Sequence, residues 1–346
     1  MSQMSSPLTA APAVRWWKPV LFLMVAVVGL WLVKWQPYYG KAQIAAQTHS
    51  IGHSLLDHGP LPPLQAAWQY AQVYFLAVWK AALLGIVLGS LLQVLIPRRW
   101  LIKMFGRGRF SGPLLGAIFS LPGMMCTCCA APVAVGMRKS MVSASSTLAF
   151  WLGNPLLNPA TLIFMGFVLG WQFTAIRLVV GLVTVLGVAL VVGKIAPESA
   201  RSLLPALPAA DERPFLQRWA VSLWGLFWQT VPVYLLAVLA LGAAQVWLFP
   251  HAEGAVDNSF WWVAAMAIAG ALFVIPTAAE IPIVQTMMLA GMGTAPALAL
   301  LITLPALSVP SLMMLRQVFP AKALWLTLGL VILCGTLTGA LALPWL

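Results

Sequence analysis

The sequence predicts an all-α polytopic membrane protein with two inverted repeats, each holding a re-entrant hairpin followed by a broken transmembrane helix. Three observations predict this class. The 346 residues are 62% hydrophobic and only 8% charged, whereas soluble domains carry about 25% charged residues. Mean hydropathy is +0.94, and several apolar runs exceed the roughly 18 residues that a spanning helix needs. Proline and asparagine interrupt some of these runs, and backbone freed by such breaks must be satisfied by protein or by a watery cavity.

The basic residues explain the net charge of +12 without a nucleic-acid partner. They lie at the ends of apolar runs, as Arg98, Arg99 and Lys103 do. This distribution is typical of cytoplasmic loops beside anionic lipid. We therefore expect a multi-pass protein of the bacterial plasma membrane, the inner membrane, with membrane lipid and no nucleic acid as a partner.

Residues 1–68 are expected to form an N-terminal anchor helix and an extracytoplasmic loop. Arg15 and Lys18 precede the apolar run 20–33, which is followed by no small-residue cleavage site. A signal peptide would end in such a site, so we expect an uncleaved anchor with a cytoplasmic N-terminus. The polar stretch 36–65 is then the loop.

The first repeat is expected at residues 69–195, and a cytoplasmic linker with four prolines follows at 196–218. The run 69–96 predicts a span, and the basic loop 97–109 indicates the cytoplasmic side. Three further apolar segments complete the repeat: 111–137, which carries three cysteines, 143–169, which carries the sequence NPLLNP, and 171–195.

The second repeat, residues 219–346, matches the first at a constant offset of 150. This offset places Pro132 on Pro282 and Pro155 on Pro305. It also places the helix 69–96 on 219–246. Matching breaks and segment lengths indicate an internal repeat.

The charges predict that the repeats are inverted. The loop 250–258 is acidic and is expected outside, opposite the basic loop 97–109. A cytoplasmic linker then requires one segment of the first repeat not to cross. The cysteine segment 111–137 is the natural candidate for a re-entrant hairpin, with 260–291 as its mirror. This gives seven spans and two hairpins; nine spans, with both broken segments crossing, stay open.

Cys126, Cys128 and Cys129 are the sharpest candidates for a site. Clustered thiolates select thiophilic ions, and the positive end of a helix favours the thiolate form. Two or three of these thiols can converge on a tight turn, as substrate-binding groups and ligands of a metalloid. Alternatively, they are small apolar packing residues, as we expect for Cys334.

The helix breaks offer further polar groups at the same depth. Asn154, Asn158 and Ser308 are candidate substrate-binding residues; alternatively, they satisfy backbone groups that the prolines free. The prolines expected to break helices are Pro132, Pro155, Pro159, Pro282 and Pro305.

Two ionisable residues are candidates for ion coupling, because charges inside membrane segments are costly and commonly functional. Glu280 is the only carboxylate within an apolar segment, and Lys80 is the most central basic residue. Glu280 would couple transport to protons, and Lys80 would pair with it or attract an anion. The alternative is an ion pair that joins the two halves.

The motif CTCCAAPVAVGMRKS, followed by FWLGNPLLNPA, resembles the ArsP/YraQ-type family of predicted permeases. The resemblance covers the chain from about Gln69 onward and leaves residues 1–68 outside. Characterised members export trivalent organoarsenicals such as methylarsenite, and many relatives have no known substrate. The resemblance implies that the three cysteines surround the substrate path and that Pro132 and Asn154-Pro155 act as scaffold.

The sequence therefore predicts a secondary-active permease that exports a soft, thiophilic solute such as a trivalent organoarsenical. The chain contains no P-loop, so an ion gradient or a partner would supply energy, and neither an enzyme nor a cofactor is expected. A homo-oligomer is left open. The alternatives are a transporter of another metal ion or a sulfur compound, and a membrane thiol oxidoreductase that uses the spacing Cys126-x-x-Cys129.

Overall fold

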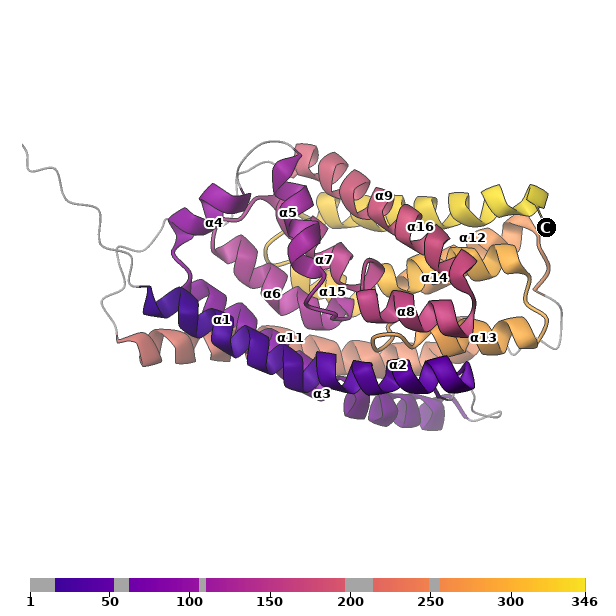
Figure 1. Cartoon of the computed structure of the whole chain (residues 1–346), viewed down its shortest axis with the longest axis horizontal. Helices are drawn as coiled ribbons and strands as arrows, with labels where there is room; N and C mark the ends of the chain where they lie inside the picture. Colours follow the sequence, from indigo (N-terminus) through magenta and orange to yellow (C-terminus); the bar gives the residue numbers. More distant parts are fainter. Residues whose placement is uncertain (1–15, 53–61, 106–109, 197–213, 249–255, 346) are drawn as a thin grey trace, which may run out of the picture.

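The computed structural model describes residues 16–52, 62–105, 110–196, 214–248 and 256–345, and every regular element in these ranges is a helix (Figure 1). The expected linker 196–218 and the acidic loop 250–258 lie mostly outside the described residues. Seven helices are long and apolar enough to cross a membrane, in the part of the chain that the structure describes. They are Trp17–Thr48, Ala67–Leu95, Ala144–Val168, Trp171–Ile195, Phe215–Ala243, Thr294–Leu315 and Ala321–Ala342.

The N-terminal helix is longer than predicted. It comprises α1 (Trp17–Leu30), a π-helical turn (Trp31–Trp35) and α2 (Gln36–Thr48), which Figure 1 draws as one continuous helix. The expectation of a loop from residue 36 is therefore wrong for 36–48. Pro37 would clash with a carbonyl in a regular helix. The π turn absorbs this conflict, because Gln36 N–H bonds to Trp31 O instead of the usual carbonyl.

The helix boundaries of the two halves correspond at the predicted offset of 150. The first half contains α3 (Pro63–Leu95), α4 (Arg98–Phe105), α5 (Ser111–Ser120), α6 (Thr127–Lys139), α7 (Ala144–Leu156), α8 (Pro159–Val168) and α9 (Trp171–Ile195). The second contains α11 (Phe215–Leu248), α12 (Phe260–Leu272), α13 (Glu280–Leu289), α14 (Thr294–Ala306), α15 (Val309–Leu315) and α16 (Ala321–Ala342), before a short 3₁₀ turn at Leu343–Trp345. α14, α15 and α16 each start 150 residues after α7, α8 and α9.

The two segments predicted as hairpins each consist of two short helices, α5 with α6 and α12 with α13. Helices of 10 to 13 residues are too short to cross the roughly 30 Å of a bilayer core. α6 contacts α15, and α13 contacts α8. The second helix of each pair therefore meets the broken helix of the other half.

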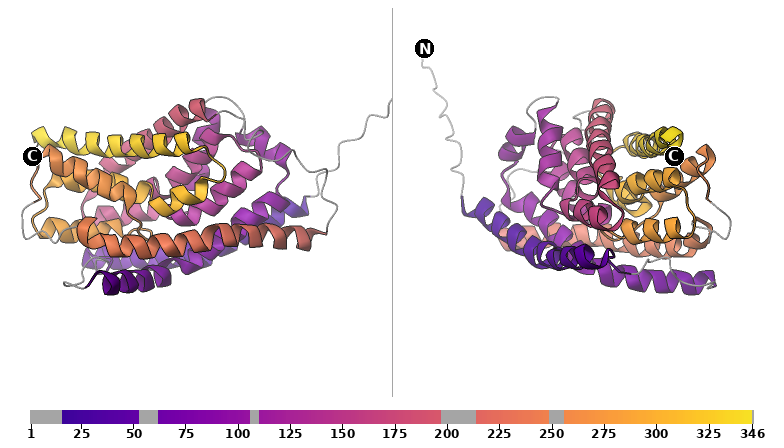
Figure 2. Two further views of the ribbon diagram at one scale, coloured as in Figure 1. Left: turned by 180° about the vertical axis from the view of Figure 1, so that it is seen from behind. Right: turned by 45° about the vertical axis from the view of Figure 1, so that its right-hand side comes forward.

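Glycine-x-x-x-glycine pairs allow close helix crossings. A Cβ atom on Gly85 or Gly89 of α3 would overlap a carbonyl oxygen of α6, so these glycines let the two helices touch backbone to backbone. Gly335 and Gly339 do the same for α16 against α14. α3 and α11 also lie side by side along the molecule (Figure 2).

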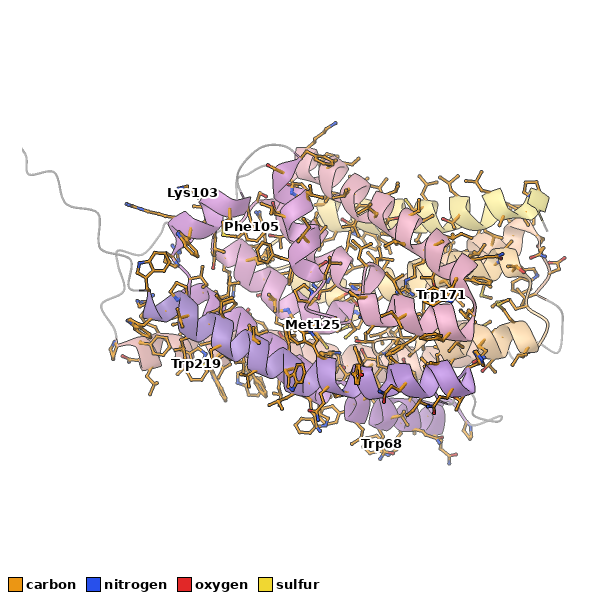
Figure 3. All side chains as sticks on the ribbon, in the orientation of Figure 1. Trp68, Lys103, Phe105, Met125, Trp171 and Trp219 are labelled. Carbon is orange, nitrogen blue, oxygen red and sulfur yellow. The ribbon has the colours of Figure 1, made fainter. Side chains whose placement is uncertain are left out.

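Large apolar side chains cover the outside of the molecule. Trp68 and Trp171 are exposed and project outward at different places in Figure 3, whereas Met125 lies midway along the molecule. Lys103 points away at one end. An apolar surface of this extent fits lipid and not water as the surrounding solvent. The chain is a multi-pass membrane protein.

Candidate functional site

The first helix break lies between α7 and α8, and its geometry follows from two residues. Pro159 has no N–H, so the carbonyl of Pro155 has no helical donor. Asn158 caps α8, because its Oδ1 accepts from the N–H groups of Ala160 at 3.0 Å and Thr161 at 3.3 Å. The N–H of Ala160 is thereby withdrawn from the carbonyl of Leu156. The break leaves two buried carbonyls that need donors.

Arg177 of α9 supplies these donors. Its Nη2 lies 2.8 Å from Pro155 O, and its Nε lies 3.5 Å from Leu156 O. Its Nη1 forms an ion pair with Glu280 Oε1 at 2.8 Å. Arg177 and Glu280 are 1% and 2% exposed, so the pair is fully buried. One guanidinium thus joins the broken helix of the first half to the hairpin of the second.

This pair corrects the partner expected for Glu280. Lys80 is exposed on α3, and its Nζ lies 5.6 Å from the ring centre of Trp79. Lys80 therefore does not pair with Glu280. The signal for Arg177 was present in the sequence, as a cation well inside the apolar run 171–195, whereas Lys194 lies at its end.

The second break, between α14 and α15, is closed by serines. Ser308 and Ser311 form a reciprocal capping box at the start of α15. Ser308 Oγ also lies 3.2 Å from Thr127 Oγ1 and 3.4 Å from Cys128 Sγ. Ser308 therefore links the second break to the first hairpin, and its position matches that of Asn158 at the offset of 150.

The three cysteine thiols do not point to one common position. Cys126 is the N-cap of α6, in an extended conformation, and Cys129 lies one turn later. This places their Sγ atoms 2.9 Å apart. Cys128 points instead to Ser308. All three are buried and free, and no group of three metal-binding side chains occurs among the described residues. The structure thus brings two thiols together and separates the third.

Asn154 holds the first hairpin tip in place. Its Oδ1 accepts from Met125 N–H at 3.4 Å, and its Nδ2 donates to Phe150 O at 2.9 Å. A Cβ on Gly123 would overlap its Oδ1, so the tip needs a glycine there. Both ends of the Asn154 amide are occupied by backbone groups, and neither group is one that Pro155 frees.

The second hairpin tip is an unwound segment, residues 273–279, with Ala278 in the left-handed region at φ 71°. Two tyrosines of α3 satisfy its carbonyls. Tyr70 OH donates to Val274 O, and Tyr74 OH donates to Ile275 O at 3.5 Å. We did not predict this role for the tyrosines, because an unwound tip so far along the chain leaves no local pattern in α3.

The tips and breaks enclose a small cavity of about 10 Å³, which has room for about one water molecule. It is the point where both halves of the chain meet. Its lining includes Cys126, Thr127, Pro155, Thr161, Thr277, Glu280 and Pro305. A solute larger than a water molecule does not fit at this size, so its entry requires the hairpins and breaks to move apart.

The N-terminal helix reaches the same place. Lys34, in the π turn, is 5% exposed and donates to Thr277 Oγ1 and Tyr38 OH, each at 3.1 Å. Trp35 Nε1 donates to Pro122 O at 2.8 Å. The helix therefore contacts both hairpin tips, although its sequence predicts only a peripheral anchor.

The prolines that were expected to break helices do not all do so. The helices end just after Pro155 and Pro305, and α8 begins at Pro159, as expected of breaks. Pro132 and Pro282 were expected to break helices, and this is wrong. Pro132 lies inside α6, which continues to Lys139, and Pro282 lies in the first turn of α13, where a missing N–H costs little.

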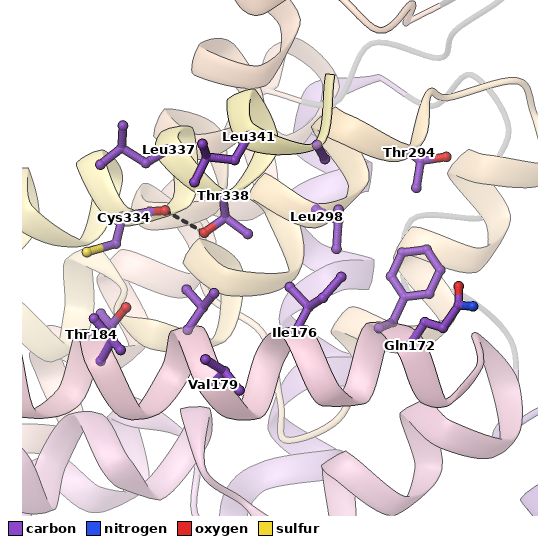
Figure 4. Close-up of a pocket in the computed structure, with 14 residues that line it drawn as sticks. Gln172, Ile176, Val179, Thr184, Thr294, Leu298, Cys334, Leu337, Thr338 and Leu341 are labelled. Atoms are coloured by element: carbon purple, nitrogen blue, oxygen red, sulfur yellow. Dashed lines mark hydrogen bonds between the residues drawn. The ribbon is translucent and has the colours of Figure 1, made fainter. Parts of the chain in front are cut away.

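A larger cavity, of about 600 Å³, lies elsewhere, between α9, α14 and α16. Figure 4 shows its mostly aliphatic lining, with Cys334 beside the hydrogen bond from Thr338. Several of its residues, such as Val179 and Leu337, are exposed on the outer surface. It carries no ionisable pair and lies apart from the two thiols, so we assign the chemistry to the small cavity.

Comparisons with known proteins agree with this architecture. The ArsP-type family described as "Predicted permease" matches residues 20–152 and 64–343. The chain is 65% identical over 346 residues to the UPF0718 protein YraQ of Escherichia coli K12, with 99% of each chain covered. It is 20% identical to the UPF0718 protein MJ0584 of Methanocaldococcus jannaschii, which covers 76% of this chain and 90% of that protein. No solved structure matches.

The matched range also corrects one expectation. Residues 1–68 were expected to lie outside the resemblance, but the match begins at residue 20. The N-terminal helix with Lys34 is thus part of the shared architecture. With two overlapping matches that together span residues 20–343, the chain belongs to this family of predicted permeases.

Proposed function

We propose that the protein is a secondary-active permease that exports a soft, thiophilic solute, such as a trivalent organoarsenical, through the small cavity between the hairpin tips. One observation carries the proposal. The Sγ atoms of Cys126 and Cys129 lie 2.9 Å apart, and Cys126 lines the cavity where both halves of the chain meet. Soft thiol pairs are suited to bind thiophilic centres.

The chemistry requires no redox step. A trivalent organoarsenical with two hydroxyl groups exchanges both for the two sulfur atoms. Each thiol proton leaves with a hydroxyl group, so two As–S bonds form and two water molecules are released. Hydrolysis on the other side of the membrane reverses the exchange. Cys128 faces Ser308 at 3.4 Å and takes no part in this binding.

Movement of the solute would follow from two inverted halves, residues 69–195 and 219–346, joined by a cytoplasmic linker at 196–218. Helix boundaries that repeat after 150 residues support this arrangement. So does Figure 1, in which α16 runs toward the marked C-terminus and α9 runs the opposite way. With the N-terminus in the cytoplasm and residues 1–68 as an added anchor, the hairpins would enter from opposite faces and open the site alternately.

Glu280 would couple this movement to protons. Its ion pair with Arg177 joins the halves, and its Oε2 has no hydrogen-bond partner among the described residues. Protonation would remove the charge that holds Arg177 and release the contact. We expect Glu280→Gln to abolish transport while the protein still folds. A well-expressed variant with normal transport would remove Glu280 from the mechanism.

A thiol oxidoreductase is the second candidate, because the same short Sγ contact would suit a disulfide. Closing it would pass two electrons and two protons to a quinone or to a disulfide of a partner protein. Cys126 is only 5% exposed and Cys129 is not exposed at all, which disfavours attack by a partner. A mixed disulfide trapped with a partner through Cys126 would favour this candidate.

The decisive transport experiment uses everted membrane vesicles and methylarsenite. The variant Cys126→Ser/Cys129→Ser is compared with Cys128→Ser, its matched control, at equal expression. We expect energy-dependent accumulation in the wild type and the control, and none in the double variant. Accumulation that survives in the double variant would remove the thiol pair from the path. No accumulation in the wild type would exclude methylarsenite as the substrate.

A further inference from the structure

Lys34 brings a positive charge to the cavity from a helix that is otherwise largely exposed to lipid. Its ammonium group donates to Thr277, which lines the cavity. Electrostatic interactions also connect it to the sulfur atoms of Cys126 and Cys129. Thr277 and Cys126 line the same cavity. A cation, a hydroxyl group and the thiol pair therefore form one contiguous cluster from three separate parts of the chain.

No carboxylate among the described residues forms an ion pair with Lys34. The ion pair found in that part of the chain is Arg177 with Glu280, so the buried carboxylate is already engaged. A buried charge without an opposite charge is costly. A protein retains such a charge inside a membrane segment when function requires it.

Three helices of the site begin at the cavity lining. α6, α8 and α13 begin at the cavity, through Thr127, Thr161 and Glu280 of their first turns, and helix starts favour negative charge. Each has at least 10 residues. At the start of α8, the Nδ2 of Asn158 is buried and has no hydrogen-bond partner in the part of the chain that the structure describes. The Oδ1 of the same amide lies 3.3 Å from the N–H of Thr161, which lines the cavity, so this unpaired donor beside the cavity is a second indication that an acceptor from outside the chain belongs here.

We propose that the permease selects solutes carrying both a thiophilic atom and a negative charge, and that Lys34 is the residue that recognises the negative charge. The inference rests on the proposed function and narrows its substrate class. The thiol pair binds the soft atom, and Lys34 balances the anionic group. Neutral thiophilic solutes bind the same thiols but gain no affinity from the charge of Lys34. The free Oε2 of Glu280 disfavours an anion on its own side, so the charged group lies toward Lys34.

The test compares two arsenicals that differ by one charge, phenylarsine oxide and its 4-carboxylate, on purified full-length protein in lipid nanodiscs. Binding is followed through tryptophan fluorescence. Thiosulfate serves as an anion with a soft sulfur atom, and sulfate as a hard anion of similar shape. The variants are Lys34→Met and Lys34→Arg. Lys80→Met is the matched control, because it removes the same charge from an exposed position.

We expect the wild type, Lys34→Arg and Lys80→Met to bind the carboxylated arsenical at least about tenfold more tightly than the neutral one, since opposite charges interact strongly in a poorly hydrated site. Lys34→Met should bind both equally, and thiosulfate should bind better than sulfate. The inference fails if the wild type shows no preference, or if Lys34→Met keeps it.

The outcomes separate this inference from the proposed function. Equal binding of both arsenicals by the wild type leaves the thiol site standing and overturns the role of Lys34. Binding of thiosulfate with loss in Lys34→Met, and no binding of either arsenical, supports the charge selection and rules out the arsenical substrate. If Lys34→Met does not fold, Lys34→Gln replaces it: equal binding of both arsenicals by Lys34→Gln supports the inference, and a preference that persists in it overturns the inference.

Discussion

The ion pair between Arg177 and Glu280 gives the sharpest stability prediction. The change Arg177→Met removes the 2.8 Å contact to Glu280 and the donors to the carbonyls of Pro155 and Leu156. It leaves a buried carboxylate with no partner for either oxygen. Removing one partner of a buried pair costs about 3–5 kcal/mol, and we expect a loss in this range.

Glu280→Gln also leaves Arg177 without its counter-ion, but it should cost less than Arg177→Met, about 3 kcal/mol, because Arg177 keeps its carbonyl contacts and the new amide oxygen can still accept a hydrogen bond. The double variant Arg177→Met/Glu280→Gln should be more stable than the sum of the single losses by about 2 kcal/mol, since no unpaired charge remains. The assay is unfolding in mixed micelles, followed by tryptophan fluorescence, with Lys80→Met as the exposed-charge control. Additivity within about 0.5 kcal/mol, the range typical of independent sites, would refute the reasoning.

Three further predictions follow from single contacts. Gly89→Val should lower the unfolding midpoint markedly, because the new side chain would overlap the Pro132 carbonyl. The control Gly187→Ala should be neutral or slightly stabilising, because nothing lies within 4 Å of a Cβ at that position. Equal effects of the two changes would contradict the close crossing of α3 and α6. Asn158→Asp should keep the helix cap and therefore the unfolding midpoint. It should lose transport in vesicles, because it removes the unpaired Nδ2 donor. Unchanged transport would show that Asn158 acts only as a helix cap. Lys80→Gln should change stability by less than about 0.5 kcal/mol and leave transport unchanged in the same vesicles; a transport defect would restore its coupling role.

The fold was largely predictable, because its main constraint is the bilayer. Apolar length selects the spans, and the short segments 111–137 and 260–291 are hairpins because they divide into helices too short to cross. The offset of 150 was readable from prolines and segment lengths alone. Its success shows that the positions of helix breaks, more than the identity of their residues, carry the repeat.

The polar partners were less predictable, because the packing of the helices decides how deeply a side chain is buried and which residue it faces. Lys34 looks like the charged flank of a short anchor until the helix is seen to continue to Thr48, which places this residue well inside it. Lys80 and Arg177 are both cations in the interior of apolar helices, and only packing decides that one is exposed and the other buried. A count of orphaned carbonyls in the sequence NPLLNP would have indicated that a donor was needed, but not which helix supplies it.

The most direct test of the thiol pair as the substrate site is to count the sulfur atoms bound to arsenic. Purified protein is loaded with methylarsenite, and the As–S bonds are counted by X-ray absorption at the arsenic edge. The account predicts two sulfur atoms per arsenic in the wild type and in Cys128→Ser, and none in Cys126→Ser/Cys129→Ser. Three sulfur atoms in the wild type, or two that persist in the double variant, would contradict it.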